Sequence, residues 1–270
     1  MSTVTLATDA ADARAIRAIE AHHAELSGAL ALRVGGVMRA AARSERVDAA
    51  RQDLVRWCET ELVPHALAEE EVLYPPAHDQ VATRLLVTSM SGEHEILTGL
   101  VARLAAADEP TEVVAAAGAL HEVFLGHVAK ENDLLLPALA ASPSVSLAGL
   151  LAGMHEQLEA SAAAAGSEAP PTPEGETTGE GGAGHACGCT EHDDGGYPEL
   201  DARAVPHAIR HATVFGALDA VAVGSGMVLV APHDPLPLLD QLAQRHPDAF
   251  GVDYLERGPE TWRILLRRVA

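Results

Sequence analysis

Residues 65–75 have the sequence HALAEEEVLYP, in which a histidine stands four residues before the first of three consecutive glutamates. Four residues are close to one turn of an α-helix, so His65 and Glu69 would project from the same face of a helix and point towards one spot. The same spacing returns in residues 127–131, HVAKE, where Glu131 follows His127 by four residues. We therefore expect two helices that each present an imidazole and a carboxylate to a shared interior.

The chain around these two motifs, from about residue 10 to 160, has the pattern of helices separated by weak breakers. Four long helices are expected at about 10–43, 47–74, 81–107 and 111–136, and a shorter fifth at about 146–160. Pro75 and Pro137 are expected to end the second and fourth helices, because proline disrupts a helix interior. Long helices joined by short loops predict an up-down four-helix bundle, which we assign to residues 1–165.

The rest of the chain changes character twice. Residues 166–197 are rich in Pro, Gly, Glu and Thr and predict a flexible linker. Residues 198–270 have the order β-α-β-α-β-β, which predicts a small two-layer α/β sandwich. Within it, Asp234 is the expected N-cap of a helix that has Pro235 in its first turn. The predicted fold class is therefore multidomain, α plus α/β.

The charge balance limits the expected partners. The chain has 18 Lys and Arg residues against 39 Asp and Glu residues, a formal net charge of −21. Such a surface repels nucleic-acid phosphates and anionic lipids, so neither nucleic acid nor a membrane is an expected partner. The first residues lack a signal-peptide pattern, and three cysteines are too few for a secreted disulfide framework. The expected location is the cytoplasm.

The first and third helices each add one histidine in a similar setting, His23 in HAELSG and His94 in HEILTG. Measured along each helix from the connecting loops, the four histidines lie at one level to within roughly 3 to 5 Å. Imidazoles and carboxylates inside a helix bundle are the usual ligands of a two-iron site, completed by an oxo or hydroxo bridge from solvent. The candidate ligands are His23, His65, Glu69, His94, His127 and Glu131.

Single members of this set carry little weight, because a lone histidine on an amphipathic helix is more often a surface or packing residue. The six matched positions together are stronger evidence for a metal site, because burying them without a metal would cost several kcal/mol in unpaired polar groups. His22 is the alternative to His23, although it would point about 100° away around the helix. Tyr74 is interpreted as a packing residue, with a contact to the site as the alternative.

The segments HHAEL, HALAEEEVLYP, EHEIL and HVAKENDLLLP resemble, in this order, the hemerythrin-like family of HHE cation-binding domains. The resemblance covers about residues 10–160 and implies that the six candidate ligands hold a non-haem di-iron centre. Oxygen-carrying hemerythrins have a further histidine and an aspartate where this sequence has Thr98 and Asn132. The pattern is more similar to bacterial hemerythrin-like proteins linked to nitric oxide, oxygen or peroxide handling and to iron-sulfur cluster repair.

The resemblance implies a metal-binding protein that binds or senses oxygen, nitric oxide or peroxide in a redox or nitrosative stress response. An unidentified redox partner protein would exchange electrons with it. One alternative is an iron donor or repair factor for iron-sulfur clusters, and another is a structural bundle without metal. The motifs do not decide whether the protein is an enzyme.

Two further groups are candidate sites. In the linker, HACGC contains His185, Cys187 and Cys189, a candidate metal or redox site. Its C-x-C spacing is a weaker metal signal than C-x-x-C, and the alternative is a mobile, oxidisable thiol pair with no fixed ligand. In the last domain, His207, His211 and His233 form a candidate C-terminal site and are candidate partners of the linker thiols. Residues 198–270 resemble an uncharacterised domain family with an H-D-P-x-P-L signature, which implies a fold similar to the small sulfur-carrier sandwich.

Overall fold

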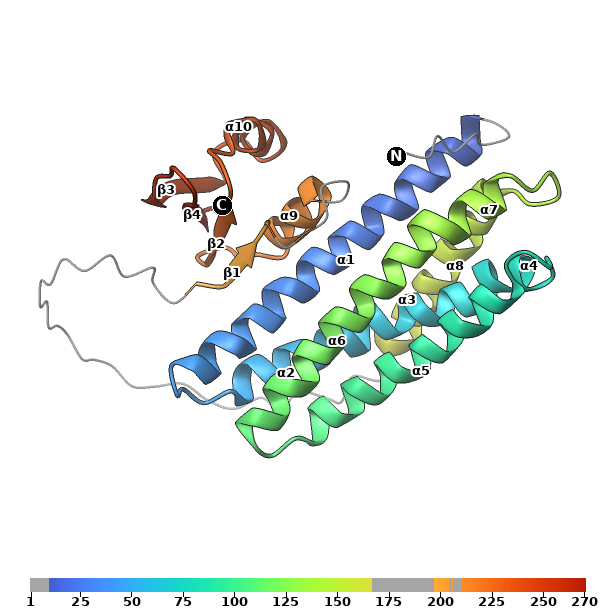
Figure 1. The fold of residues 1–270 in the computed structure, drawn as a ribbon, viewed down its shortest axis with the longest axis horizontal. Coiled ribbons are helices and arrows are strands. Elements are labelled where there is room, and N and C mark those ends of the chain that lie inside the picture. The colour runs from blue at the N-terminus through green and yellow to red at the C-terminus, as the bar shows by residue number, and fades with distance from the viewer. Residues whose placement is uncertain (1–9, 167–196, 204, 206–209) are drawn as a thin grey trace, which may run out of the picture.

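A computed structural model describes residues 10–166, 197–203, 205 and 210–270, which form a helical bundle and a small α/β unit (Figure 1). The expected fold class, α plus α/β, is confirmed. The predicted linker lies outside the described residues apart from its two ends, and His185, Cys187 and Cys189 fall in that part. His207 is outside the described residues as well.

The bundle consists of four helical rods and one covering helix. The first rod is α1, Ala10–Ala42, and the third is α5, Arg84–Ala106. The second rod alternates α-helical and π-helical segments, namely α2 (Asp48–Trp57), η1 (Cys58–Leu62), α3 (Val63–Ala68), η2 (Glu69–Leu73) and α4 (Tyr74–His78). The fourth rod does the same in α6 (Pro110–Lys130), η3 (Glu131–Leu135) and α7 (Leu136–Ala140). The covering helix is α8, Leu147–Gly166, which packs on α1, α3 and η2.

The expectation that Pro75 and Pro137 end their helices is wrong. The second rod continues to His78 and the fourth to Ala140. Each of the three π-helical segments is followed by a proline at the second position of the next α-helix: Pro64, Pro75 and Pro137. A proline ring clashes with the carbonyl four residues earlier, and that carbonyl lies inside the π-helical segment in all three cases. The wider π turn thus lets the rod pass the proline without a break.

The apolar core of the bundle is divided into two clusters. On α1, one cluster includes Ile19 and the residues before it, and the other begins at Leu26. On α5 they are separated in the same way, between Met90 and Leu97. The segment between the clusters carries His23 on α1 and His94 on α5. A polar layer therefore crosses the middle of the bundle, with apolar packing on both sides.

The helix over residues 110–140 is, among the described residues, the one that is long and apolar enough to cross a membrane by length and composition. Its apolar side chains contribute to both core clusters of the bundle. It also carries His127 and Glu131, which are buried in the polar layer. Packing inside the bundle accounts for its composition.

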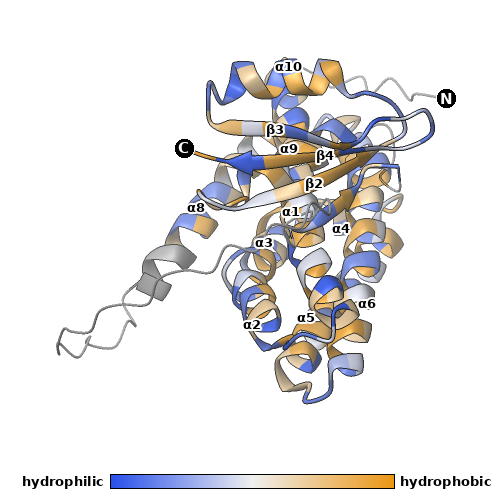
Figure 2. Ribbon diagram, turned by 90° about the vertical axis from the view of Figure 1, so that its left-hand side faces the viewer, coloured by the Kyte–Doolittle hydropathy of each residue, from blue (hydrophilic) through white to orange (hydrophobic). Residues whose placement is uncertain are grey.

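The α/β unit contains four strands and two helices. In chain order they are β1 (Glu199–Asp201), α9 (Arg210–Asp219), β2 (Gly226–Ala231), α10 (Leu236–Arg245), β3 (Phe250–Glu256) and β4 (Trp262–Arg268). The strands lie in the order β1-β2-β4-β3, with β1 parallel to β2 and the other pairs antiparallel. Figure 2 shows α10 at the side of this unit away from the bundle. The expected β-α-β-α-β-β order is confirmed.

The two parts of the chain meet where α9 lies alongside α1 (Figure 1). Gly28 of α1 and Gly216 of α9 bring the two backbones close together, because a Cβ on Gly28 would lie 2.2 Å from the Thr213 carbonyl oxygen. A Cβ on Gly216 would lie 2.4 Å from the Cα of Glu25. Leu32 of α1 belongs to the hydrophobic core of the α/β unit. Helix α1 therefore contributes to both parts.

Candidate metal centre

The polar layer contains one histidine from each rod and two glutamates. His23 comes from α1, His94 from α5, the pair His65 and Glu69 from the second rod, and the pair His127 and Glu131 from the fourth. All six residues are at most 4% exposed. The structure thus brings together all six residues that the sequence singles out in the bundle.

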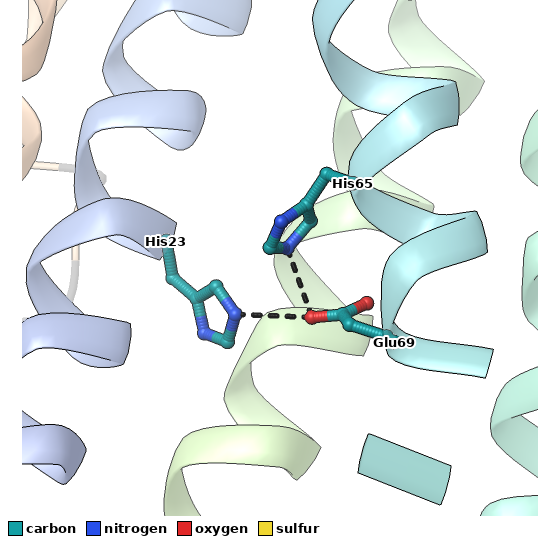
Figure 3. Close-up of side chains that lie close together, drawn as sticks. All are labelled: His23, His65 and Glu69. Carbon is teal, nitrogen blue, oxygen red and sulfur yellow. Dashed lines mark hydrogen bonds and ion pairs between the residues drawn. The ribbon is translucent and has the colours of Figure 1, made fainter. Parts of the chain in front are cut away.

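Glu69 lies at the meeting point of three imidazoles. Its Oε1 is 3.2 Å from Nε2 of His23 and 2.9 Å from Nε2 of His65 (Figure 3). Its Oε2 is 3.5 Å from Nε2 of His94. One carboxylate therefore faces side chains from three rods.

Glu131 occupies the other side of the layer. Its Oε2 is 3.4 Å from Nε2 of His23, and its Oε1 is 3.6 Å from Nε2 of His127. The hydroxyl of Tyr74 donates a hydrogen bond of 2.9 Å to Oε1 of Glu131. Tyr74 packs in the core, as interpreted, and its hydroxyl also lies among the candidate ligands, which was the alternative. Burial, followed by the nearby Glu131 carboxylate, raises the pKa of the Tyr74 phenol far above its usual value, which keeps it protonated.

Three of the four imidazoles are held from behind. In each, Nδ1 donates to an oxygen that can only accept, so Nδ1 carries a proton and Nε2 faces the centre. The three pairs are His23 with Asn132 at 2.8 Å, His94 with Glu70 at 2.9 Å and His127 with Glu93 at 3.0 Å.

The hydrogen bonds that these three partners make to the imidazoles were not predicted from the sequence. Each stands directly beside a candidate ligand in the chain: Glu70 after Glu69, Asn132 after Glu131, and Glu93 before His94. Each nevertheless bonds an imidazole on a different rod. In the sequence, these three residues can be recognised only as polar residues next to a candidate ligand. That position does not predict which imidazole each of them contacts.

His65 differs from the other three imidazoles. Neither of its ring nitrogens has a hydrogen-bond partner among the described residues. The 2.9 Å separation between its Nε2 and Oε1 of Glu69 is an ion-pair distance without hydrogen-bond geometry. Glu131 Oε2 is also buried without a hydrogen bond there. Buried polar atoms normally have partners, so these atoms point to a bound group that completes them.

The electrostatics of the layer also fit a cation. Although burial opposes its charge, the hydrogen bond to Glu69 and the Glu131 carboxylate raise the pKa of His23 to about 9. Burial likewise opposes ionisation of Glu69, but His65 and the hydrogen bond from His23 hold the pKa of Glu69 well below its usual value. Two buried carboxylates need compensating positive charge, which imidazole protons or bound metal ions can supply.

Two groups of three ligand atoms each have the spacing of a metal site. They are His23, His65 and Glu69, and Glu69, His94 and His127; within each group the ligand atoms lie within 4.8 Å of one another. Both groups are fully buried, and they share Glu69. These two groups contain five of the six residues, all except Glu131, so the polar layer offers two adjoining sets of ligand atoms for cation binding.

Two cavities adjoin this layer, and His65 lines both. The smaller, about 10 Å³, has mostly apolar walls that include Leu62, Leu97 and Phe124, together with Thr98. This volume is near the minimum that holds one water molecule. The larger, about 100 Å³, is bordered by α8 and lined by His22 and His155.

His22 is not part of either group of ligand atoms. Its ring packs against that of His65, with centroids 4.9 Å apart. Burial, followed by repulsion from His65, lowers the pKa of His22 to about 4. The geometry therefore agrees with His23 as the α1 member of the set.

The remaining candidates divide into two groups. His211 and His233 line one cavity in the α/β unit, separate from the bundle. His207 and the linker residues His185, Cys187 and Cys189 lie outside the described residues. Cys58 is buried in the bundle core, where burial raises the pKa of its thiol to about 12.

Comparison with protein families identifies two matches. Residues 14–139 match the family "Hemerythrin HHE cation binding domain", and residues 199–268 match "Uncharacterized conserved protein (DUF2249)". Both expected resemblances are confirmed. No curated protein and no solved structure matches the chain. The first match includes all six residues of the polar layer and supports cation binding there.

Proposed function

Residues 14–139 form a hemerythrin HHE cation-binding domain, and from this premise we propose that the polar layer holds two non-haem iron ions. The observation that carries the proposal is the pair of three-ligand groups that share Glu69. Glu69 and Glu131 would lie between the ions and offset their charge. When bound, the iron pair would supply redox chemistry and open positions for oxygen, nitric oxide or peroxide, with an oxo or hydroxo bridge from solvent.

The side chains around the layer suit a small ligand. The walls of the 10 Å³ cavity, which include Leu62, Leu97 and Phe124, exclude bulk water and leave room for a molecule of only a few atoms. The Tyr74 hydroxyl stays protonated and donates a hydrogen bond to Glu131. Asn132, Glu70 and Glu93 keep three imidazoles in the orientation that a metal ligand requires.

On this basis, the protein senses or removes oxygen, nitric oxide or peroxide in the cytoplasm during redox or nitrosative stress. A redox partner protein would exchange electrons with the centre. The net charge of −21 makes nucleic acids and anionic membranes unfavourable partners.

A second candidate function is the supply of iron for assembly or repair of iron-sulfur clusters. The observation that favours it is His65, whose ring has no hydrogen bond from behind within the described part of the chain and lies beside the 100 Å³ cavity. A ligand that is not held in place releases metal more easily than one that is held. Rapid loss of iron to a chelator would favour this function, and stable iron with reversible gas binding would favour the first.

The test is iron content together with ultraviolet-visible absorption, measured on the full chain purified with and without air. We expect about two irons per chain and loss of both iron and absorption when Glu69 and Glu131 are changed to alanine. The matched control changes Glu71 and Asp133 to alanine, since each is exposed and stands two residues after one of those glutamates. Absence of iron from the unaltered protein, or iron kept by the Glu69/Glu131 variant, would contradict the proposal.

A further inference from the structure

A second enclosed site lies in the α/β unit. A cavity of about 80 Å³ opens where β1 and β2 end and α9 and α10 begin. Its apolar walls include Val214, Leu229 and Leu238, which belong to the core of this unit. Because β1 and β2 run parallel, their carboxyl ends lie at the same edge of the sheet. Ligands in open α/β sheets characteristically bind outside the carboxyl ends of parallel strands.

The polar groups that line this cavity are all basic. They are Arg210 and His211 at the start of α9 and His233 in the loop between β2 and α10. Among the described residues, the cavity lining contains no carboxylate, although the chain has 39 acidic residues against 18 Lys and Arg. Three basic side chains from two separate segments thus converge on one small volume.

Arg210 is fixed in its orientation. Its Nε and Nη2 donate hydrogen bonds of 3.2 and 3.0 Å to the Val205 carbonyl oxygen. A guanidinium carries five N–H groups, so these two bonds leave it further donors for a ligand. Its planar fork matches the paired oxygens of a carboxylate or other oxyanion.

The loop that carries His233 keeps its one carboxylate away from this volume. The expectation that Asp234 caps α10 is wrong: Pro235 is at the N-cap, and no side chain caps the helix. Instead, Asp234 Oδ1 accepts a hydrogen bond of 2.9 Å from the Tyr254 hydroxyl. Pro232, Pro235 and Pro237 restrict the backbone on both sides of Asp234. The first N–H groups of α10 therefore lie beside the cavity without a hydrogen bond from a capping side chain of the described residues.

We propose that this cavity binds a small anion whose charged end carries two or more oxygens, such as a carboxylate, phosphate or sulfur oxyanion. Arg210 supplies the principal charge and paired N–H donors, and His211 and His233 supply further hydrogen bonds. The apolar walls accept a short hydrocarbon part, and the volume restricts the ligand to a few heavy atoms. The proposal is independent of iron, since the lining includes no residue of the bundle.

The test is isothermal titration of the full chain with inorganic phosphate, sulfate and acetate, each in a separate experiment, and with acetamide as the uncharged counterpart of acetate. We expect at least one anion to bind, acetamide not to bind, and Arg210→Gln or His233→Gln to weaken binding about tenfold or more. Comparison of the three anions identifies which oxyanion class the cavity prefers.

The matched control is Arg267→Gln, which removes the same charge from an exposed arginine of β4 that pairs with Asp253. Its affinity should equal that of the unaltered protein. Melting temperature is measured for every variant, and His211→Gln, at an exposed position, serves if Arg210→Gln fails to fold. No binding of any anion tighter than roughly 10 mM, equal binding of acetamide, or equal weakening by Arg267→Gln would each overturn the proposal.

Discussion

At the scale of single residues, the metal centre depends on neighbours of the ligands as much as on the ligands. Asn132, Glu70 and Glu93 each accept a hydrogen bond from Nδ1 of an imidazole on another rod. Glu93 is itself held by an ion pair with Lys130. Although burial opposes ionisation, the hydrogen bonds from Lys130 and His127 lower the pKa of Glu93, so it remains a charged acceptor.

Asn132→Leu is expected to weaken iron binding about 10- to 100-fold, because His23 then loses the acceptor that fixes its tautomer and ring orientation. The dissociation constant can be measured by competition with a chromogenic chelator. Asn132→Asp should preserve the affinity, since a carboxylate accepts the same hydrogen bond. Asp133→Asn, at the exposed neighbouring position, is the control. Equal affinity in Asn132→Leu and the unaltered protein would argue against this role.

Four of the six candidate ligands, in the pairs His65/Glu69 and His127/Glu131, could be predicted from the sequence because an i to i+4 spacing defines a helix face without knowledge of other helices. His23 and His94 could be predicted because they lie at a matching level along the other two helices. The contact of Tyr74 with Glu131 could not be predicted in the same way. It depends on the rotation of one rod relative to another and on the π-helical segment η2, which shifts the face on which Tyr74 lies. The same limitation applies to Asn132, whose partner is 109 residues away.

At the scale of helices and strands, the most informative elements are η2 and η3, which begin at Glu69 and Glu131. Each therefore starts at a candidate ligand and ends just before a helix with proline at its second position. Local rules predict that Pro75 and Pro137 end their helices. Tertiary packing overrides this, because Leu136, Leu139 and Ala140 beyond η3 are buried and would lose their contacts if the helix stopped.

Pro137→Ala is expected to raise the unfolding free energy of the metal-free protein by about 1 kcal/mol, because alanine has the higher helix propensity and supplies the backbone N–H that proline lacks. The rod can then tighten into a regular α-helix, which turns Glu131 relative to His127 and weakens iron binding. Chemical denaturation and the chelator competition measure the two effects. Pro143→Ala, in the loop before α8, should change neither. Unchanged iron affinity in Pro137→Ala would show that the proline does not maintain η3.

At the scale of the whole molecule, the two parts of the chain are not independent, because α1 serves both. Composition and periodicity predict a bundle and an α/β unit, and the structure contains both. Their contact was not predicted, since Gly28 and Gly216 have the appearance of ordinary small residues in apolar helices. Their significance lies in the close approach of two backbones, which no pattern within either helix reveals.

Gly28→Ala is expected to destabilise the contact between α1 and α9 by about 1 to 3 kcal/mol, because the added Cβ would overlap the Thr213 carbonyl oxygen. Scanning calorimetry should record a lower melting temperature or a separate transition of the α/β unit. The control is Gly99→Ala on α5, where nothing lies within 4 Å of the added Cβ, and which should be neutral or slightly stabilising. Identical melting of Gly28→Ala and the unaltered protein would contradict the tight crossing.

The shared helix also restricts how the length of this chain can change during evolution. His23 faces the interior of the bundle and Gly28 faces α9; five residues at about 100° each place them about 140° apart around α1. Insertion or deletion of one residue between them would rotate one face by about 100° and misplace either the ligand or the docking surface. We therefore expect this interval to tolerate no change of length wherever both domains occur in one chain.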